Sequence, residues 1–544
     1  MYLTNFLMYR NMKKNNKYIW VLLSALLIGI FITNCKDDDD LGNPNRLFRP
    51  IIKDYSYSGT WIKIEWDRYE GANQFELQLS VDSFATFVEN IIIDTTIYTF
   101  ENLEYDTEYQ LRIRSLGDVL NSEFFVNRNI TTSDYPTKLI TPTFEDMIDK
   151  QIRVKWTDIA YDSLGVFKGD TLVQVVALTP ADNDAGEIII SQLEPLTTYK
   201  VKAYLDGNYM GKKTFNTTAA QVFEGAIIDL RDSVYSYELF TSVVNNLTAE
   251  NYPGGVTIVL EGGKTYEMEG PQIVTGLHVV TGLSLSGYAT MEVTGNFDAP
   301  AAVDVDKVKL ERIIFTEHPD KPKTDANFGG SYIFNFSQSD VHIGKITIED
   351  CDIRYKRGLF RIKAATIVDS VIINNCVVDS IAGYGILNMD NEGCVMYNII
   401  ITNSTFSHVP SYLVRADKDL TTVPNSLYIE NITTCHMPDP GSFLISLNNK
   451  TYDGGITIKD CLFGQAQTDN SSVRGFRSAS SNITLSNNYK TSDLTWEPPY
   501  ELECTDLGNT SEEIFADPYN NDFTVSDDRL VDKENKVGDP RWWK

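Results

Sequence analysis

Short segments in which apolar and polar residues alternate follow one another through residues 47–219. Trp61–Trp66 and Phe75–Leu79 are the clearest of them, and Ile152–Trp156 repeats the pattern. Alternation with a period of two predicts β-strands that bury one face, and turns about every ten residues predict a β-sandwich. We therefore predict two β-sandwiches, one over residues 47–133 and one over residues 134–219.

A tyrosine lies six residues after a leucine in each predicted sandwich, as Leu103 and Tyr109 and then as Leu193 and Tyr199. This spacing resembles the corner of fibronectin type III domains, where a buried tyrosine bonds its hydroxyl to nearby backbone. The resemblance implies two such domains with Tyr109 and Tyr199 at the corners. It also implies that the tryptophans of these modules are core residues rather than platforms for sugars. Neither segment shows a cluster of functional side chains, so we expect both domains to be spacers.

One strand pattern recurs six times in the C-terminal half, each time ending in an Asp or Asn. Successive repeats are 25 to 29 residues apart, and they lack the leucine consensus of leucine-rich repeats. Strand-rich coils of this length without a helix signal predict a right-handed parallel β-helix over residues 220–510, so the fold class is all-β. The Asp/Asn side chains should stack at one turn and bond the backbone of the next rung. The repeated residues are Asp350, Asn375, Asn403, Asn431, Asp460 and Asn487.

Three cysteines directly follow this turn position: Cys351, Cys376 and Cys461. Small and apolar residues occupy the same place in other coils, so we predict that the cysteines are buried core residues. Cys351 and Cys376 lie on adjacent rungs, so they could either form a disulfide or stack as free thiols in an unbonded ladder. We favour the unbonded ladder. The six cysteines after Cys35 lack the regular spacing of a disulfide scaffold or a zinc site.

Both ends of the predicted β-helix carry candidate caps. Residues 232–246 are the best helix candidate of the chain, and they precede segments that resemble the opening coils of pectin-lyase-like proteins. Residues 511–544 resemble the terminal segment of surface β-helix lipoproteins of Bacteroidetes, a largely uncharacterised family. We predict that Trp542 and Trp543 pack within this C-terminal cap, although with Trp496 and Tyr500 they could instead form a sugar platform.

A second strand recurs in each coil, and its alternation places two polar columns on one flat outer face. One column contains Asn335, Arg361, Asn388, Arg415 and Ser446, and the other contains Ser337, Lys363, Asp390, Asp417 and Asn448. Their spacing along the axis is that of neighbouring strands.

The resemblance to pectin-lyase-like proteins gives this face a candidate chemistry. A polysaccharide lyase needs an Arg or Lys base beside a uronate carboxylate and groups that stabilise the resulting anion, often through Ca²⁺. The candidate catalytic residues are Lys363, Arg361 and Arg415. The candidate substrate-binding residues are Asn335, Asn388, Asp390, Asp417 and Asn448, of which Asp390 and Asp417 could also bind Ca²⁺. No segment matches a lyase motif closely, and we favour a face of paired charges or simple glycan contacts.

The formal net charge of −28 argues against nucleic acid and anionic lipid as partners, because both would be repelled. An acidic polysaccharide would need a local basic patch or a bridging cation. Phosphate-binding, dinucleotide-binding and HExxH motifs are absent from the sequence. The five histidines are scattered along the chain, and none has a Ser or Cys at a spacing typical of a nucleophile motif.

The N-terminus has the features of an export signal. Basic residues precede the apolar stretch 19–33, which is short for a membrane span. Residues 32–35 resemble a lipobox ending at Cys35, although Asn34 departs from the small residue usual before the cleavage site. The acidic run 37–40 resembles a surface-export signal of Bacteroidetes lipoproteins. The resemblance implies a signal peptide over residues 1–34, lipidation of Cys35 and an acidic tether over 35–46, on the outer-membrane surface.

The sequence thus predicts a lipid-anchored surface protein that binds a polysaccharide along the β-helix, within a glycan-utilisation system. Whether it also processes the polysaccharide stays open. The alternatives are a pectate- or pectin-type lyase that acts by β-elimination and a structural or adhesive spacer without a glycan ligand. The identity of the sugar, its linkage and any metal are not encoded in a recognisable motif.

Overall fold

The computed structural model describes residues 45–544 except 127–128, 322, 325–326, 448–450, 470, 526, 532–535 and 544. The predicted leader and Cys35 lie outside the described residues, as does Asn448. The chain divides after Thr137 into two compact units, of which the first holds one β-sandwich and the second holds another β-sandwich and the β-helix. Within the described residues, no helix is long and apolar enough to cross a membrane.

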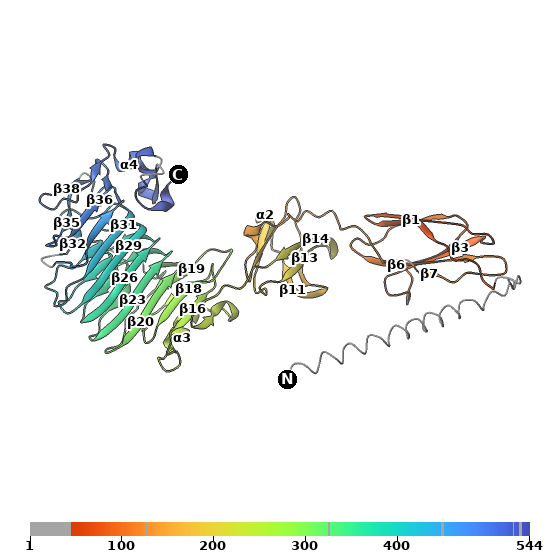
Figure 1. Cartoon of the computed structure of the whole chain (residues 1–544), viewed down its shortest axis with the longest axis horizontal. Helices are drawn as coiled ribbons and strands as arrows, with labels where there is room; N and C mark the ends of the chain where they lie inside the picture. Colours follow the sequence, from red (N-terminus) through yellow and green to blue (C-terminus); the bar gives the residue numbers. More distant parts are fainter. Residues whose placement is uncertain are drawn as a thin grey trace, which may run out of the picture. The chain divides into compact units, whose positions relative to one another are not determined.

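The first β-sandwich pairs a three-stranded antiparallel sheet with a larger antiparallel sheet, as in fibronectin type III domains (Figure 1). The first sheet contains β1 (Ile52–Ser58), β2 (Trp61–Trp66) and β5 (Ile97–Phe100). The second contains β4 (Glu89–Ile93), β3 (Gln74–Ser80), β6 (Glu108–Leu116) and β7 (Phe125–Val126), with β8 (Ile130–Thr131) paired to β6.

The second β-sandwich repeats this scheme with sheets of two and four strands. The smaller sheet contains β9 (Ile152–Lys155) and β12 (Glu187–Ile190). The larger contains β11 (Thr171–Ala177), β10 (Ser163–Lys168), β13 (Thr198–Leu205) and β14 (Asn208–Asn216). Two short helices, η1 (Phe144–Asp146) and α2 (Pro180–Ala185), connect the strands.

The tyrosine corners are present in both sandwiches. The Tyr109 hydroxyl accepts a hydrogen bond from the Glu104 backbone N–H at 2.9 Å, and the Tyr199 hydroxyl accepts one from Glu194 at 2.9 Å. Trp66 and Trp156 are buried, as predicted. Trp61 is 36% exposed, because the alternation of β2 turns it to the outer side of the sheet, so the prediction of a core position was wrong for this residue.

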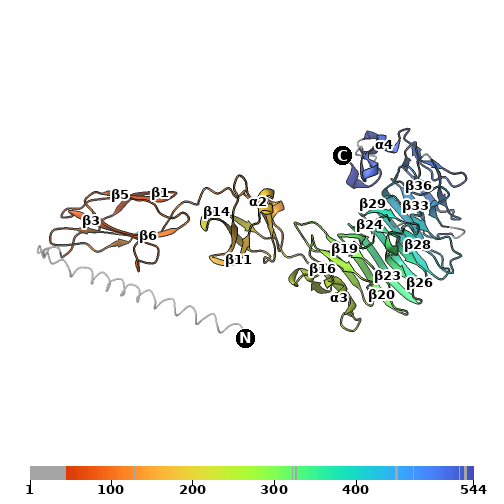
Figure 2. The same ribbon diagram turned by 180° about the vertical axis from the view of Figure 1, so that it is seen from behind.

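The rest of the chain forms a parallel β-helix of about nine turns, whose strands stack in three parallel columns (Figures 1 and 2). The first column contains β15 (Ala226–Asp229), β16 (Val256–Leu260), β18 (Leu277–Thr281), β20 (Asp304–Glu311), β23 (Val341–Glu349), β26 (Thr366–Asn374), β29 (Val395–Ser407), β31 (Ser426–Cys435), β33 (Gly455–Lys459) and β36 (Ile483–Ser486). The second contains β17 (Thr265–Met268), β19 (Ala289–Val293), β21 (Ile313–Glu317), β24 (Asp352–Lys356), β27 (Val377–Ile381), the ends of β29 and β31, β34 (Leu462–Phe463), β37 (Tyr489–Lys490) and β39 (Thr505–Asp506).

The third column is a separate sheet, here called the seven-stranded sheet. It contains β22 (Tyr332–Phe336), β25 (Gly358–Ile362), β28 (Leu387–Met389), β30 (Val414–Arg415), β32 (Phe443–Ser446), β35 (Ser472–Arg477) and β38 (Thr495–Trp496). Together with the two sandwiches, the three columns confirm the predicted all-β fold class.

The recurring Asp/Asn turn explains why the coils stack. All six residues adopt the left-handed conformation, with φ between 51° and 56°, which Asn and Asp tolerate better than most residues. Their side chains bond one another: Asn487 Nδ2 donates to Asp460 Oδ1 at 2.6 Å, and Asn431 Nδ2 donates to Asn403 Oδ1 at 3.5 Å. The predicted stack is therefore confirmed, but these side chains meet neighbouring side chains rather than the backbone of the next rung.

Replacing Asn403 by alanine is expected to lower the free energy of unfolding by about 1–3 kcal/mol, because alanine is strained at φ 51° and loses the amide bonds. The Asn403 amide donates to Asn374 Oδ1 at 2.9 Å. Denaturant unfolding would measure the loss. Asn403→Gly keeps the backbone conformation accessible and should cost less, so equal stability of the alanine variant and the native chain would contradict this role.

The cysteines of the repeat are buried in the β-helix core, as predicted. Cys351, Cys376 and Cys461 are at most 2% exposed, and all three are free thiols. The unbonded ladder is therefore confirmed for Cys351 and Cys376.

A short helix covers the first coil, but it is smaller than predicted. The helix α3 (Leu239–Asn245) buries Phe240 and Val244 against the core, whereas residues 233–238 are not helical. The reason is a competing interaction with β17: the Glu267 N–H donates to the Tyr237 carbonyl at 2.9 Å, and this segment runs beside the edge strand. The turn η2 (Leu230–Asp232) precedes it.

The C-terminal cap packs on the outer side of the second column. Its Phe515, Phe523 and Leu530 form a separate core with Cys435 and Leu462 of the β-helix. The Trp542 ring lies against the Phe523 ring of the cap, with centroids 5.7 Å apart, which confirms that Trp542 packs in the cap. Its indole N–H also donates to the Thr405 hydroxyl of β29 at 2.7 Å. The cap contains α4 (Ser511–Ile514), β40 (Phe515–Asp517), η4 (Pro518–Asn520), β41 (Asp522–Val525), α5 (Asp528–Val531) and η5 (Pro540–Trp542). Elsewhere, in the β-helix, the short helix η3 (Phe328–Gly330) lies before β22.

Candidate functional site

The seven-stranded sheet brings the first predicted polar column into register. Each residue of the column is the direct partner of the next, from β22 to β35. Arg477 of β35 continues the column and was missed by the sequence reasoning. The complete column is Asn335, Arg361, Asn388, Arg415, Ser446 and Arg477.

Each arginine of this column stacks on an aromatic ring. The guanidinium carbon lies 4.5 Å from the centroid of the Tyr384 ring for Arg361 and 5.2 Å from that of Tyr412 for Arg415. For Arg477 the distance to the Phe443 ring is 4.6 Å. Such cation–π contacts hold the guanidinium planes in place and shield one face of each from water.

Gly358 makes room for the aromatic rings at the start of the sheet. A Cβ atom at this position would lie 2.9 Å from both the Tyr332 ring and the Tyr384 side chain. Those two rings meet edge to face, with centroids 5.6 Å apart. A side chain at this position would clash with both tyrosines, so Gly358 leaves the room in which Tyr384 lies beneath Arg361.

Carboxylates lie beside two of the arginines. Arg361 Nε donates to Asp390 Oδ2 at 3.0 Å, and Arg415 Nε donates to Asp417 Oδ1 at 2.9 Å. Arg415 and Lys418 also lie 3.9 and 3.8 Å from Asp390 Oδ1. Burial opposes the charge of Arg361, but the hydrogen bond and charge of Asp390 outweigh it and raise the pKa of this guanidinium.

These contacts bear on the predicted chemistry. A raised pKa keeps Arg361 protonated, which suits a ligand for anions better than a general base. Three cations surround Asp390, and this charge disfavours Ca²⁺ there. Among the described residues, no group of three or more His, Cys, Asp or Glu side chains could hold a metal. Lys363 is exposed directly after β25, and its role as a base stays a prediction, as does that of Arg415.

The local charge of the sheet is opposite to that of the whole chain. The described strands of the seven-stranded sheet and the two residues after each carry five cations and three carboxylates, a net charge of +2 against −28 overall. The cations are Arg361, Lys363, Arg415, Arg474 and Arg477, and the carboxylates are Asp390, Asp417 and Glu497. The sheet is therefore locally basic in a chain that is acidic overall, although Arg361, Arg415 and Arg474 are paired with these three carboxylates.

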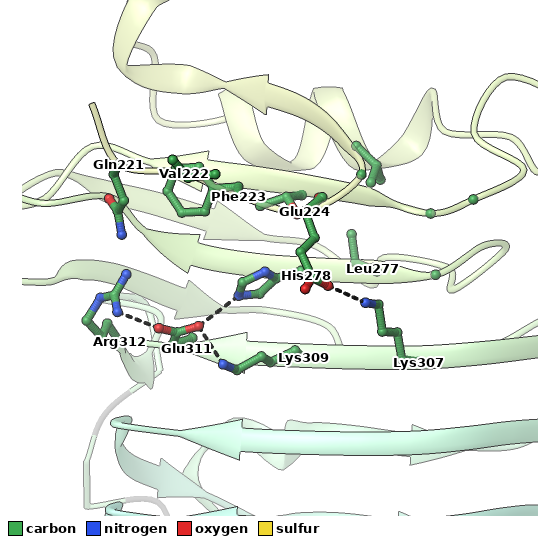
Figure 3. Close-up of a pocket in the computed structure, with 16 residues that line it drawn as sticks. Gln221, Val222, Phe223, Glu224, Leu277, His278, Lys307, Lys309, Glu311 and Arg312 are labelled. Atoms are coloured by element: carbon green, nitrogen blue, oxygen red, sulfur yellow. Dashed lines mark hydrogen bonds and ion pairs between the residues drawn. The ribbon is translucent and has the colours of Figure 1, made fainter. Parts of the chain in front are cut away.

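A pocket lies on the outer side of the first column, near the first coil (Figure 3). The cavity has a volume of about 440 Å³. The segment 221–225 forms one wall, and residues 254–257 at the start of β16 and residues in and next to β18 and β20 form the rest. Glu311 accepts hydrogen bonds there from His278 at 3.0 Å and Lys309 at 2.7 Å, and it also pairs with Arg312. Glu224 of the wall reaches Lys307 at 3.1 Å.

The charged side chains of this pocket form ion pairs and hydrogen bonds with one another. The hydrogen bond from His278, followed by those cations, lowers the pKa of Glu311 to about 2 despite its burial. Glu311 therefore stays ionised and cannot act as an acid at neutral pH. No motif in the sequence indicates this cluster, because His278 and Glu311 meet only through the register of β18 on β20.

Two histidines that the sequence analysis described as scattered lie together beside the C-terminal cap. The rings of His408 and His436 stack with centroids 4.5 Å apart, and His408 Nδ1 bonds the buried Asp379 at 2.8 Å. Both histidines, like Ser380 one rung earlier, occupy one left-handed turn on successive coils. The sequence analysis missed this pair because this second turn column has no constant residue type that would indicate it.

Comparison with known proteins matches parts of the chain. One domain of unknown function, DUF4957, matches residues 295–408, and another, DUF5123, matches residues 399–542. No curated protein matches the chain. A solved segment of two fibronectin type III domains from chicken tenascin is similar at 16% identity, with a TM-score of 0.19, over 32% of this chain and 100% of that chain. The FN1-FN3 domains of chicken CNTN1 are similar at 15% identity, with a TM-score of 0.15, over 32% of this chain and 67% of that chain.

Proposed function

We propose that the seven-stranded sheet binds an acidic polysaccharide whose chain runs along the axis of the β-helix. The observation that carries the proposal is the column of three arginines, each stacked on an aromatic ring, in a basic patch of a strongly acidic chain. Arginine offers planar paired donors that match a carboxylate or sulfate, and sugar rings pack well beside aromatic and guanidinium planes.

The shape of the sheet supports a polymer rather than a small ligand. Its strands are parallel and stacked from β22 to β38, so equivalent side chains repeat along one line. The arginines are held by ring contacts and by hydrogen bonds, such as that from Arg477 Nη2 to the Ser446 hydroxyl at 2.7 Å. A preorganised row of donors loses little conformational entropy when a chain binds along it.

The contacts favour binding over β-elimination. Arg361 is paired with Asp390 and stays charged, so it would hold a carboxylate rather than remove a proton. We also propose, from the N-terminal sequence, that a lipid on Cys35 anchors the protein to the outer-membrane surface within a glycan-utilisation system. The two sandwiches would then be spacers between anchor and β-helix.

Affinity electrophoresis tests the proposal. Polygalacturonate or hyaluronan in the gel is expected to retard the protein, and dextran is expected to leave its mobility unchanged. Replacing Arg361, Arg415 and Arg477 together by glutamine should abolish the retardation, because the column then has no cation. Arg354→Gln is the matched control, since Arg354 is 37% exposed on β24, outside the seven-stranded sheet.

Unchanged mobility in every acidic polymer would overturn the proposal, and so would equal retardation of the triple variant and the native chain. Incubation of the native protein with polygalacturonate and Ca²⁺ separates binding from catalysis. Products that absorb in the ultraviolet would show β-elimination and return Lys363 and Arg415 to consideration as the base.

A further inference from the structure

The arginines on the face of the seven-stranded sheet differ in whether a carboxylate already engages them. Arg361 Nε and Arg415 Nε donate to Asp390 and Asp417, at 3.0 and 2.9 Å. Arg474 is also in an ion pair, at 3.2 Å. An acidic ligand at any of these arginines would have to compete with a carboxylate that the fold holds in place. These positions therefore offer little free positive charge to an anion.

Two further guanidinium groups beside this face have no carboxylate partner among the described residues. They belong to Arg357, directly before β25, and to Arg477, at the end of β35. Arg477 donates one side-chain hydrogen bond, to the Ser446 hydroxyl at 2.7 Å, and the Nε atom of each arginine is buried without a partner in the part of the chain that the structure describes. Unpaired donors of this kind favour an anionic ligand, because its oxygens would satisfy the guanidinium group.

Aromatic rings hold both unpaired guanidinium groups in place. The guanidinium carbon of Arg357 lies 4.6 Å from the centroid of the Tyr384 ring, and that of Arg477 lies 4.6 Å from the centroid of the Phe443 ring. Such contacts fix a cation without neutralising its charge. Lys363 is exposed as well, but within the described residues no ring contacts its flexible side chain, which would lose more conformational entropy on binding.

The spacing of the two arginines sets the length of a ligand that engages both. Their strands are four steps apart in the sheet, from β25 through β28, β30 and β32 to β35. At about 4.8 Å for each step, the two rungs are about 19 Å apart. A pyranose residue in an extended 1,4-linked chain is about as long as one step, so a chain of about five sugars spans this separation.

We infer that Arg357 and Arg477 are the principal contacts for the acidic groups of the ligand, which is an acidic chain of at least about five sugars. This inference rests on the proposed function and adds Arg357 to the binding face. Arg361 contributes less, because Asp390 engages it. Asp390 itself opposes binding, since its carboxylate repels an anion and occupies Arg361 and Lys418.

Calorimetric titration of the full chain with oligogalacturonates tests the assignment. Hexagalacturonate is expected to bind at least about tenfold more tightly than digalacturonate, because only the longer chain reaches both arginines. Arg357→Gln and Arg477→Gln should each remove most of this difference. Arg354→Gln, on β24 outside the face, should leave it unchanged. If only hyaluronan retards the chain in electrophoresis, its hexasaccharide and disaccharide take the place of these two probes.

Asp390→Asn distinguishes a loss of charge repulsion from a structural effect. Asparagine keeps the size of the side chain and removes its charge, which frees Arg361 and Lys418. The hexasaccharide is therefore expected to bind about fivefold more tightly to this variant than to the native chain. A purely structural role of Asp390 would instead weaken binding or leave it unchanged.

The outcomes separate this inference from the proposed function. Suppose that the native chain binds the hexasaccharide. Full affinity of Arg357→Gln or of Arg477→Gln, or a failure of Asp390→Asn to tighten binding, would then overturn the inference and leave the proposed function intact. If the native chain binds neither acidic series, both fail. Circular dichroism of each variant would confirm that it is folded before titration.

Discussion

Replacing Phe334 by alanine is expected to lower the free energy of unfolding of the β-helix by about 3–5 kcal/mol. Phe334 of β22 is fully buried, and its ring centroid lies 5.4 Å from that of Phe297 and 5.1 Å from that of Phe360. Alanine would leave a cavity among these rings, directly beneath the sheet that holds the arginine column. The cost includes both lost burial and lost ring contacts.

Hydrogen exchange of the β22 and β25 amides would measure this loss locally, and thermal unfolding would measure it globally. Phe334→Leu keeps most of the buried volume and is expected to cost about 1 kcal/mol. If the alanine variant were as stable as the leucine variant, Phe334 would not be a packing centre of the β-helix.

Acidification is expected to destabilise the β-helix and its C-terminal cap through His436. Burial, followed by the charge of His408, lowers the pKa of His436 to about 4 in the folded chain. Since the unfolded value is about 6.5, the folded state binds fewer protons than the unfolded state between these limits. The stabilisation is therefore complete above pH 6.5 and falls by about 3 kcal/mol as the pH decreases to 4.

Urea unfolding at pH 7 and at pH 4.5 would show the effect as a loss of stability that His436→Gln reduces. His342→Gln is a control whose effect on stability should have the opposite pH dependence. The hydrogen bond to Asp304, followed by that to Asp369, raises the pKa of His342, so its contribution to stability appears below pH 6.5 and disappears as the pH rises. The same slope for native and His436→Gln chains would exclude His436 as the source.

The main outline of the fold could be predicted because each element has a local pattern. The alternation in Trp61–Trp66 and the corner at Tyr109 need only neighbouring residues, and the turn at Asn403 repeats at a near-constant spacing. The first polar column followed from the same periodicity, since a period of two fixes which side chains share a face.

The rest of the site depends on contacts that the sequence does not display. Arg477 lies 31 residues after its partner Ser446. The loop in this coil makes that interval hard to recognise as one step of the polar column. Tyr384 comes before β28 rather than within it, so its place beneath Arg361 depends on the turn at Gly385, whose φ is 62°. Glu311 meets His278 only after two rungs are in register.

The C-terminal cap has a practical consequence for work with shortened chains. A fragment that ended at residue 510 would uncover Leu462 and Cys435, two apolar side chains that Phe515 and Phe523 now cover. Newly exposed apolar surface of this kind promotes self-association. The exposed Cys435 thiol would also be open to oxidation. A fragment that stays monodisperse for crystallisation or imaging therefore has to retain residues 511–543.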